Sequence, residues 1–589
     1  MKTWLVALVT IGCSSGSFNA GDGEGEGEGG PCDSDATRCD GAVFQTCEDG
    51  AWSGETACGD GRVCDETRGC VSCLPGTAQC SGSDVLRCGE DGQTSSVVET
   101  CDAAAGLQCQ NGACLSACAI AKASSTYIGC EYWPTVTVNA HLGEYGGAFD
   151  FAVAVGNPQS VPVSVTVERA GATVATATVP PDDVATIVLP WVPELLQRPD
   201  YSGFGGEMAA EHSALVAGGA YRLTSTMPVS AYQFNPLQFE SGGYNSFSND
   251  ASLLLPVRAL AGRYIAIARP SFSVSGFSIP GFFSVVGTED ATQVTIRFSA
   301  HTEAGGGLGA YAPGQTETFT LARGDVLQIV SARSFAPAQC SGSACIGGPE
   351  YDLTGTSIEA DKPVALFSGH SCSFIPFDRW ACDHLEEQIF PLEAWGSSII
   401  AAATEPQVGN EPNVWKVVSG SANNAITFEP AVQADVTLGE GAYIEFQAQG
   451  AFRMTGTGRV ALAQFMVGED FNGKFTEPAV GDPAMGLGVP YEQFRTSYDF
   501  LTPATYTKSY VNVIAKLGAL PTLDDAVVPE LTAIAETGFG YVRIEIAPGA
   551  HHIESTIDPD GFGITVSGIA SYTSYLYPGG LDLESLPIE

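Results

Sequence analysis

Thirteen of the chain's 19 cysteines lie between Cys32 and Cys118, and this density limits what the N-terminal region can fold into. Such spacing predicts a disulfide framework in an exported protein, because a reducing cytosol keeps thiols unpaired. Zinc is the alternative, but no C-x2-C pair faces a second one and the segment has no histidine. We predict two six-cysteine modules, residues 32–72 and 73–117, whose disulfide connectivity the sequence leaves open. Three cysteines recur 41 residues later: Cys32, Cys39 and Cys47 as Cys73, Cys80 and Cys88.

The first residues have the pattern of an export signal. Lys2 precedes a short apolar run that ends at Gly12-Cys13, which resembles the lipobox of bacterial lipoproteins. We therefore expect residues 1–12 to be a signal peptide and Cys13 to be lipidated, the alternative being a signal peptide with an incidental cysteine. Residues 13–31 alternate glycine with glutamate and predict a flexible linker. The expected location is the outer membrane or cell surface, with membrane contact through the lipid only, because no other stretch is apolar enough to span a bilayer.

The charge balance excludes one class of partner. Lys and Arg number 25 against 67 Asp and Glu, which gives a net charge of −42. Such a surface repels phosphate backbones, so we expect no nucleic-acid binding. The acidity favours a cationic partner or a divalent cation, or it serves only to keep a large protein soluble.

Beyond about residue 131, strand patterns dominate the sequence. "FDFAVAVGNPQSVPVSVTV" and "VWKVVSGSANNAITF" each contain two alternating apolar runs around a turn, which predicts hairpins and a mainly β fold. The best helical pattern, residues 522–536, is interrupted by Pro529.

Two sequence markers recur in step along this region. One is a Thr or Ser pair, a turn, and a strand that holds Val229, Val364, Val460 or Ile564. The other is Pro256, Pro391 or Pro490, followed four residues later by Leu260, Trp395 or Phe494. Val229 to Val364 is 135 residues, and so is Pro256 to Pro391. We predict about four tandem antiparallel β-sandwich-like repeats after the small disulfide-rich region, at residues 118–240, 241–378, 379–475 and 476–589.

The stretch "CDHLEEQ", which begins at Cys382, holds the densest group of ionisable residues. Pro391, three residues beyond it, and its place before a repeat predict a loop at the end of a sandwich. We expect Asp383, His384, Glu386 and Glu387 to form a structural or recognition loop, with an acid/base or metal site as the alternative. Asp383 and Asp482 both lie eight residues before a proline. The local disulfide candidates are Cys118 with Cys130, Cys340 with Cys345, and Cys372 with Cys382.

Other signatures of catalysis are missing from the sequence. It has no G-x-S-x-G elbow, H-E-x-x-H motif, P-loop or dinucleotide-binding glycine motif, so we predict no catalytic residues, no cofactor and no dedicated metal site. His551 and His552 are interpreted as a surface pair, with a metal site as the alternative. Calcium held by distributed carboxylates stays open.

Several motifs resemble one family. "TSIEADKPVALFSGHSC", "CDHLEEQIFPLEAWGSS", "LLPVRALAGRYIAIARP" and "GFGITVSGIASYTSYLYPGGLDL" are similar to the IgGFc-binding protein N-terminal domain family, over residues 118–582. The resemblance implies a non-catalytic, extracellular binding or adhesion protein of the bacterial surface. Its expected partner is an extracellular protein or glycan. The alternatives are a passive structural spacer and a secreted hydrolase with an unrecognised carboxylate/His site.

Overall fold

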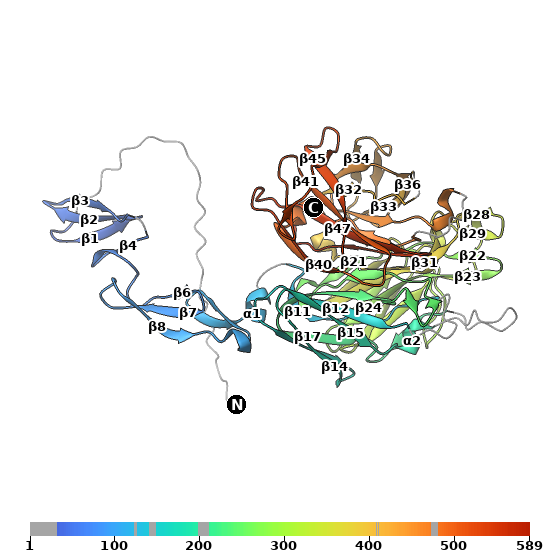
Figure 1. Cartoon of the computed structure of the whole chain (residues 1–589), viewed down its shortest axis with the longest axis horizontal. Helices are drawn as coiled ribbons and strands as arrows, with labels where there is room; N and C mark the ends of the chain where they lie inside the picture. Colours follow the sequence, from blue (N-terminus) through green and yellow to red (C-terminus); the bar gives the residue numbers. More distant parts are fainter. Residues whose placement is uncertain are drawn as a thin grey trace, which may run out of the picture. The chain divides into compact units, whose positions relative to one another are not determined.

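The chain folds into two compact units: an N-terminal unit of residues 1–101 and 109–114, and a C-terminal unit of residues 102–108 and 115–589. The computed structural model (Figure 1) describes residues 32–59, 61–122, 126–140, 149–197, 211–407, 409, 411–472 and 481–588. Cys13 and the segments predicted as signal peptide and linker lie outside the described residues. None of the helices that the structure describes has the length and apolar character needed to cross a membrane.

The N-terminal unit contains module 1 and most of module 2, each built from short antiparallel strands. Each has one three-stranded sheet and one two-stranded sheet. Module 1 contains β1 (Thr37–Asp40), β2 (Val43–Glu48), β3 (Ala51–Ala57), β4 (Val63–Asp65) and β5 (Gly69–Val71). Module 2 contains β6 (Ala78–Ser81), β7 (Asp84–Cys88), β8 (Ser95–Thr100), β9 (Leu107–Gln110) and β10 (Ala113–Ser116).

Both modules have the same disulfide connectivity, which the sequence could not give. The first cysteine pairs with the third, the second with the fifth, and the fourth with the sixth. Because modules of this size cannot bury a large core, these bonds supply the stabilisation that a core would otherwise give. The pairs are Cys32–Cys47, Cys39–Cys64 and Cys58–Cys70 in module 1, and Cys73–Cys88, Cys80–Cys109 and Cys101–Cys114 in module 2.

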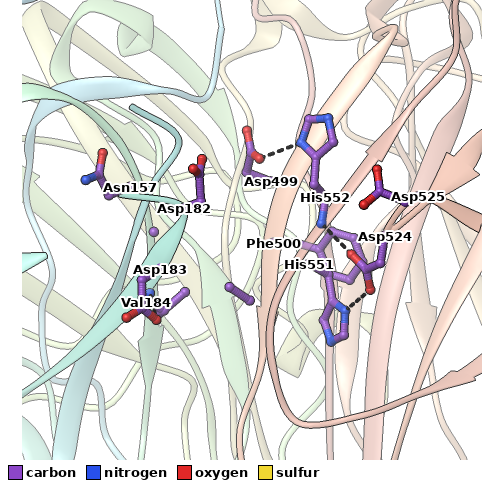
Figure 2. A pocket seen from close by; sticks show the side chains of 12 residues that line it. Asn157, Asp182, Asp183, Val184, Asp499, Phe500, Asp524, Asp525, His551 and His552 are labelled. Atoms are coloured by element: carbon purple, nitrogen blue, oxygen red, sulfur yellow. Dashed lines mark hydrogen bonds and ion pairs between the residues drawn. The ribbon is translucent and has the colours of Figure 1, made fainter. Parts of the chain in front are cut away.

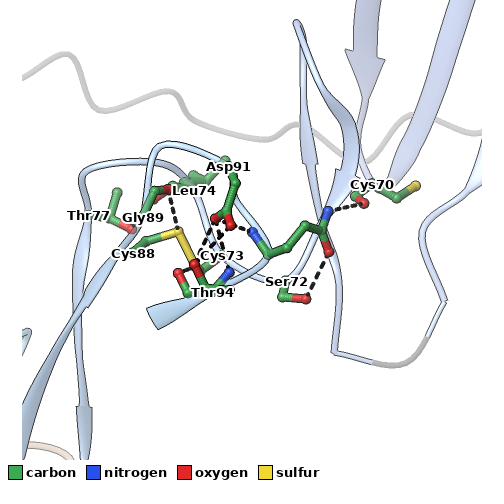
Figure 3. Close-up of a disulfide and its surroundings, with 10 residues drawn as sticks. Cys70, Ser72, Cys73, Leu74, Thr77, Cys88, Gly89, Asp91 and Thr94 are labelled. Carbon is green, nitrogen blue, oxygen red and sulfur yellow. Dashed lines mark hydrogen bonds between the residues drawn. A yellow bond between two sulfur atoms is a disulfide. The ribbon is translucent and has the colours of Figure 1, made fainter. Parts of the chain in front are cut away.

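The turn between β7 and β8 joins module 2 to the end of module 1 (Figure 3). Asp91 shapes this turn, since its Oδ1 accepts the backbone N–H groups of Gln93 and Thr94 at 3.0 and 3.1 Å. These two hydrogen bonds lower the pKa of Asp91. The Ser72 backbone N–H, at the end of module 1, donates to the Gly92 carbonyl at 2.7 Å. The two modules, whose cysteines have similar spacing, are therefore also in direct contact within the N-terminal unit.

The C-terminal unit repeats one arrangement of antiparallel strands four times. In each repeat, the first and third strands pair with the first half of the sixth strand, and the third also pairs with the fourth. The second strand pairs with the fifth and with the second half of the sixth, which also carries the last strand. The mainly β fold with several sheets is therefore as predicted, and Figure 1 shows the repeats from cyan (repeat 1) to red (repeat 4).

The strands of the repeats have the following bounds. Repeat 1 contains β11 (Gly129–Tyr132), β12 (Phe151–Asn157), β13 (Val163–Arg169), β14 (Ala172–Val179), β15 (Asp183–Leu189), β17 (Tyr221–Phe234) and β20 (Ala251–Leu253). Repeat 2 contains β21 (Ala261–Ile265), β24 (Gly281–Gly287), β25 (Thr292–Arg297), β26 (Thr316–Leu321), β27 (Val326–Val330), β30 (Ser357–Phe374) and β31 (Cys382–Gln388). Repeat 3 contains β32 (Ser398–Ala402), β33 (Asn413–Ser419), β34 (Asn424–Glu429), β35 (Val436–Leu438), β36 (Tyr443–Ala448), β37 (Ala451–Gly456), β38 (Val460–Phe465) and β39 (Met485–Leu487). Repeat 4 contains β40 (Ser497–Thr502), β41 (Lys508–Lys516), β42 (Thr522–Leu523), β43 (Ala526–Val527), β44 (Thr532–Ala533), β45 (Phe539–Ile546), β46 (Gly549–Glu554), β47 (Gly563–Ala570) and β48 (Thr573–Pro578).

The sixth strand distinguishes the first two repeats from the last two. It is one long strand, β17 or β30, in repeats 1 and 2, and it is split into β37 and β38 or β46 and β47 in repeats 3 and 4. By strand pairing, β20, β31 and β39 belong to the preceding repeat, although they lie beyond residues 240, 378 and 475. The domain boundaries given from the sequence stay predictions. The helix expected at residues 522–536 is wrong, because this segment forms β42, β43 and β44, which pair with β46 and β45.

The remaining elements are short additions to these sheets. Strand β16 (Ala214–Val216) extends the repeat 2 sheet beside β27, and repeat 2 carries an extra four-stranded sheet. That sheet contains β22 (Phe272–Val274), β23 (Phe277–Ile279), β28 (Pro337–Ser341) and β29 (Ala344–Gly347). The others are β18 (Glu240–Ser241), β19 (Tyr244–Asn245), α1 (Ala117–Lys122), α2 (Pro193–Leu196) and the 3-10 turns η1 (Ala103–Ala105), η2 (Val257–Ala259), η3 (Pro349–Tyr351), η4 (Leu392–Ala394), η5 (Glu469–Asn472) and η6 (Tyr491–Gln493).

One apolar core runs through all four repeats. The proline marker enters it each time, because Pro256, Pro391 and Pro490 each begin a 3-10 turn that directs the residue four positions later inward. Trp395, which follows Pro391 in this marker, is 1% exposed. The four sandwiches therefore share buried surface and pack as a single compact unit.

Three tyrosine hydroxyls fasten the first strand of a repeat to the sixth. In repeat 2, the Tyr264 hydroxyl accepts the Ala261 N–H at 3.2 Å and donates to the Val364 carbonyl at 2.7 Å. Ile399 takes this place in repeat 3 and makes only apolar contacts there. The same two bonds are made by Tyr132 with Gly129 and Val229, and by Tyr498 with Arg495 and Phe562.

Removal of one such hydroxyl tests its contribution to stability. Tyr264→Phe leaves the Ala261 N–H and the Val364 carbonyl without their partner inside the core. We expect this variant to lose about 1–3 kcal/mol of unfolding free energy in guanidinium titrations. The control is Tyr244→Phe, because Tyr244 is 41% exposed. Equal stability of the two variants would contradict the role given to Tyr264.

Candidate functional site

The residues predicted as a loop, Asp383, His384, Glu386 and Glu387, form part of a buried strand instead. They lie in β31, and all four side chains are 0% exposed. The loop prediction is therefore wrong at these positions. These residues form a strand because β31 pairs closely with β30 at Gly369. A Cβ atom at Gly369 would lie 1.8 Å from the Leu385 carbonyl oxygen, so only glycine permits this approach. All three local disulfide candidates are present: Cys372–Cys382, Cys118–Cys130 and Cys340–Cys345.

One face of β31 is hydrogen-bonded to repeat 1. Glu386 Oε2 accepts the Thr137 hydroxyl at 2.7 Å and Asn235 Nδ2 at 3.1 Å, and its Oε1 accepts Gln233 Nε2 at 3.0 Å. His384 Nε2 lies 3.4 Å from Glu386 Oε2. The partners come from segments about 150 residues or more away in sequence, so the polar side chains of β31 are internal links between repeats.

The other face of β31 contacts repeats 1 and 4. Glu387 Oε1 accepts the Ser252 hydroxyl at 2.8 Å, and Asp383 Oδ2 accepts the Thr573 hydroxyl at 2.8 Å. Burial raises the pKa of both Glu387 and Asp383 well above the usual range, and the nearby Asp482 carboxyl raises that of Asp383 further. Because no side chain of this group reaches the surface, it offers no access to a substrate or partner.

Metal coordination has no prepared site among the described residues. These residues contain no group of three or more His, Cys, Asp or Glu side chains arranged to hold a metal ion. This applies to His551 and His552 as well as to β31.

An open pocket of about 330 Å³ lies between repeats 1 and 4 (Figure 2). Its repeat 1 wall is formed by the end of β12 and the turn before β15, and its repeat 4 wall by β40, β46 and the β42–β43 turn. Three of its aspartates have positive φ angles, which aspartate tolerates in tight turns. Its ionisable side chains are Asp182, Asp183, Asp499, Asp524, Asp525, His551 and His552.

His551 forms the buried part of the repeat 4 wall. Its Nδ1 lies 2.7 Å from Asp524 Oδ2, and its Nε2 lies 2.7 Å from the Ala547 carbonyl oxygen. The ring stacks on Phe500 with centroids 5.3 Å apart. Asp524 Oδ1 also accepts the His552 backbone N–H at 3.0 Å, so this carboxylate fixes both histidines to the β42–β43 turn.

His552 lies at the edge of the pocket and is about half exposed. Its Nδ1 lies 2.7 Å from Asp499 Oδ1, and its Nε2 lies 3.7 Å from Glu554 Oε2. The hydrogen bond to the Asp499 carboxylate raises the pKa of His552 above its ordinary value. The interpretation of His551 and His552 as a surface pair therefore fits His552, whereas His551 is 9% exposed.

The pocket suits a positively charged group. Its five carboxyl groups outnumber its two imidazoles, and no lysine or arginine among the described residues lines it. The sequence gives only a weak indication of this pocket. The doublets Asp182-Asp183 and Asp524-Asp525 both fall at turns, but only the folded chain shows that these turns face one pocket.

The fold and this pocket define an exported, disulfide-stapled protein of tandem β repeats with a surface suited to binding. Residues 250–568 match the family described as IgGFc binding protein, and because this is more than half of the 589 residues, the chain belongs to that family. The IgGFc-binding protein of Homo sapiens is 24% identical over 334 residues, which are 55% of this chain. The match spans only 6% of the length of the human protein.

The pairing of His552 with Asp499 can be tested by titration. Asp499→Asn removes the negative charge and the main acceptor, so the pKa of His552 should fall toward about 6.5. Histidine-selective NMR over a pH series measures this shift. Asp435→Asn, an exposed acid outside the pocket, is the control and should leave the His552 titration unchanged. An unchanged pKa in Asp499→Asn would contradict the pairing.

Proposed function

We propose that this protein is a non-catalytic binding protein of the cell surface, whose partner is an extracellular protein. Membership in the IgGFc-binding protein family is the observation that carries this proposal. The pocket between repeats 1 and 4 supplies the contact, because its excess of carboxylates attracts a lysine or arginine side chain of the partner. The net charge of −42 speeds association with such a partner by electrostatic steering.

An exposed tryptophan favours binding over a passive spacer. Trp380 is 48% exposed on the segment between β30 and β31, which Cys372–Cys382 closes. Backbone N–H groups of Gly468 and Asp470 in repeat 3 donate to the Ile375 and Trp380 carbonyls at 2.7 and 2.6 Å. Tryptophan is among the side chains that dominate binding energy at protein interfaces. A rigidly held, exposed tryptophan therefore favours a binding role over that of a spacer.

The hydrolase alternative loses its main support in the burial of β31. The carboxylates and the histidine that suggested an acid/base site are 0% exposed, and each is hydrogen-bonded or packed against other repeats. A hydrolase needs at least one such group in contact with substrate.

Binding is tested with a purified immunoglobulin G Fc fragment as the first probe, because the human relative is named for that ligand. We expect salt-sensitive binding of Fc to the immobilised full chain in surface plasmon resonance. The combined variant Asp182→Asn, Asp183→Asn, Asp525→Asn should weaken the affinity by at least about tenfold.

The matched control removes the same number of charges elsewhere: Asp435→Asn, Glu440→Gln and Glu530→Gln, all exposed and outside the pocket. Equal losses in both variants would show that net charge, not the pocket, attracts the probe. No binding of Fc by the wild type at micromolar concentration would refute an immunoglobulin ligand.

We also propose that Cys13 carries a lipid that anchors the protein to the outer membrane or cell surface. The apolar run before Cys13 and the glycine- and glutamate-rich stretch after it support this proposal. Wild-type protein should partition into the detergent phase of a Triton X-114 extract, and Cys13→Ala should move to the aqueous phase. Identical partitioning of the two would contradict the anchor.

A further inference from the structure

The last strands of the four repeats meet inside the C-terminal unit. Strand β20 packs against β31 and β48, and β39 packs against the same two strands, which closes a ring of four. We call this ring the junction. Asp250 joins its members, because its carboxyl group accepts backbone N–H groups from all four strands. They are Ala251 at 2.9 Å, Glu386 at 3.1 Å, Met485 at 3.0 Å and Leu576 at 3.4 Å.

Three further carboxyl groups, those of Asp383, Glu387 and Asp482, lie at the junction, and two of them have an oxygen without a partner. Glu387 Oε2 and Asp482 Oδ2 are buried and make no hydrogen bond. The Asp482 carboxyl raises the pKa of Asp383, whose own hydrogen-bond donors are Thr573, Ser574 and the His384 backbone N–H. No lysine or arginine among the described residues forms a hydrogen bond or ion pair with any of these carboxyl groups.

A different buried carboxylate of the same unit shows the contrast. Asp352 lies between repeats 2 and 3, where Lys416 Nζ contacts its Oδ2 at 2.8 Å and both side chains are 0% exposed. A buried negative charge without such a counter-ion costs several kcal/mol, so a carboxyl group in that situation keeps its proton.

We propose that the junction between the four repeats is held by protons on buried carboxyl groups, and that it loosens when rising pH removes them. Asp482 and Glu387 hold protons at their unpartnered oxygens, and the pair Asp383–Asp482 shares at least one. The protein is then most firmly assembled in mildly acidic surroundings. The ionisable groups around these carboxyls are Asp250, Glu386, Glu469 and Tyr506, and His384 lies beside Glu386.

Burial supports the sign of this effect. It raises the pKa of Asp482 to about 8 and that of Asp250, Asp383 and Glu387 well above the usual range. A carboxyl whose pKa is higher in the folded than in the unfolded chain stabilises the fold below its unfolded value, and this stability is lost as pH rises through the folded value. For Asp482 the window therefore extends from about 4 to about 8.

The test follows the unfolding equilibrium of the full chain in guanidinium at intervals from about pH 5 to about pH 8. The folded-to-unfolded ratio should fall with rising pH by about tenfold per pH unit for each proton that only the folded chain holds. Asp482→Asn removes one such proton and should flatten the slope by up to that factor. Asp435→Asn, an exposed acid of repeat 3, should keep the wild-type slope.

A second variant and a chelator experiment complete the test. If Asp482→Asn does not fold, Glu387→Gln serves in its place, since its amide oxygen keeps the bonds from Ser252 and Leu253. A chelator, EDTA, is added at constant pH. Loss of stability with EDTA would mean that a metal ion, not protons, neutralises the junction and would overturn the proposal. A wild-type slope that is flat or rising, or equal slopes in wild type and both junction variants, would also overturn it.

Discussion

Four backbone N–H groups donate hydrogen bonds to the carboxyl of Asp250, and the packing of the four repeats in the C-terminal unit depends on this one acceptor. Strands β20 and β39 are three residues long and could not hold a sheet edge by their ladder bonds alone. The acceptor at their meeting point satisfies donors that would otherwise be buried without partners. Because each donor comes from a different repeat, no single repeat can complete this arrangement, and the four sandwiches are expected to unfold together rather than one by one.

Local patterns were enough to predict the fold class. Alternating apolar residues around turns predicted the hairpins, and the matched spacing of Val229 with Val364 and of Pro256 with Pro391 predicted tandem repeats, because both signals depend on neighbours in sequence. The first copy of the proline marker was missed, since repeat 1 has no proline there and only Tyr132 marks its place. The helical pattern at 522–536 failed because pairing with β46 and β45 overrides a weak local preference.

The site could be predicted much less well, and β31 shows why. Asp383, His384, Glu386 and Glu387 read as exposed because charged side chains rarely lie in a buried strand. Their burial depends on donors such as Thr137 and Thr573, which lie about 190 to 250 residues away in the sequence and carry no pattern of their own. The pocket has the same difficulty, since its aspartates come from turns of repeats 1 and 4 and only the closed arrangement of repeats brings them together.

The chemistry of the junction explains why acids, rather than amides, occupy it. An asparagine at position 250 would place its own N–H donors against the backbone N–H groups of β31, β39 and β48, whereas a carboxylate offers acceptors in every direction. Burial raises the pKa of Asp250 although these donors lower it, and Asp250 in turn raises the pKa of Asp383 and Glu387. The buried carboxyl groups of the junction thus form a single coupled group, in which the central hydrogen bonds and the response to pH have the same origin.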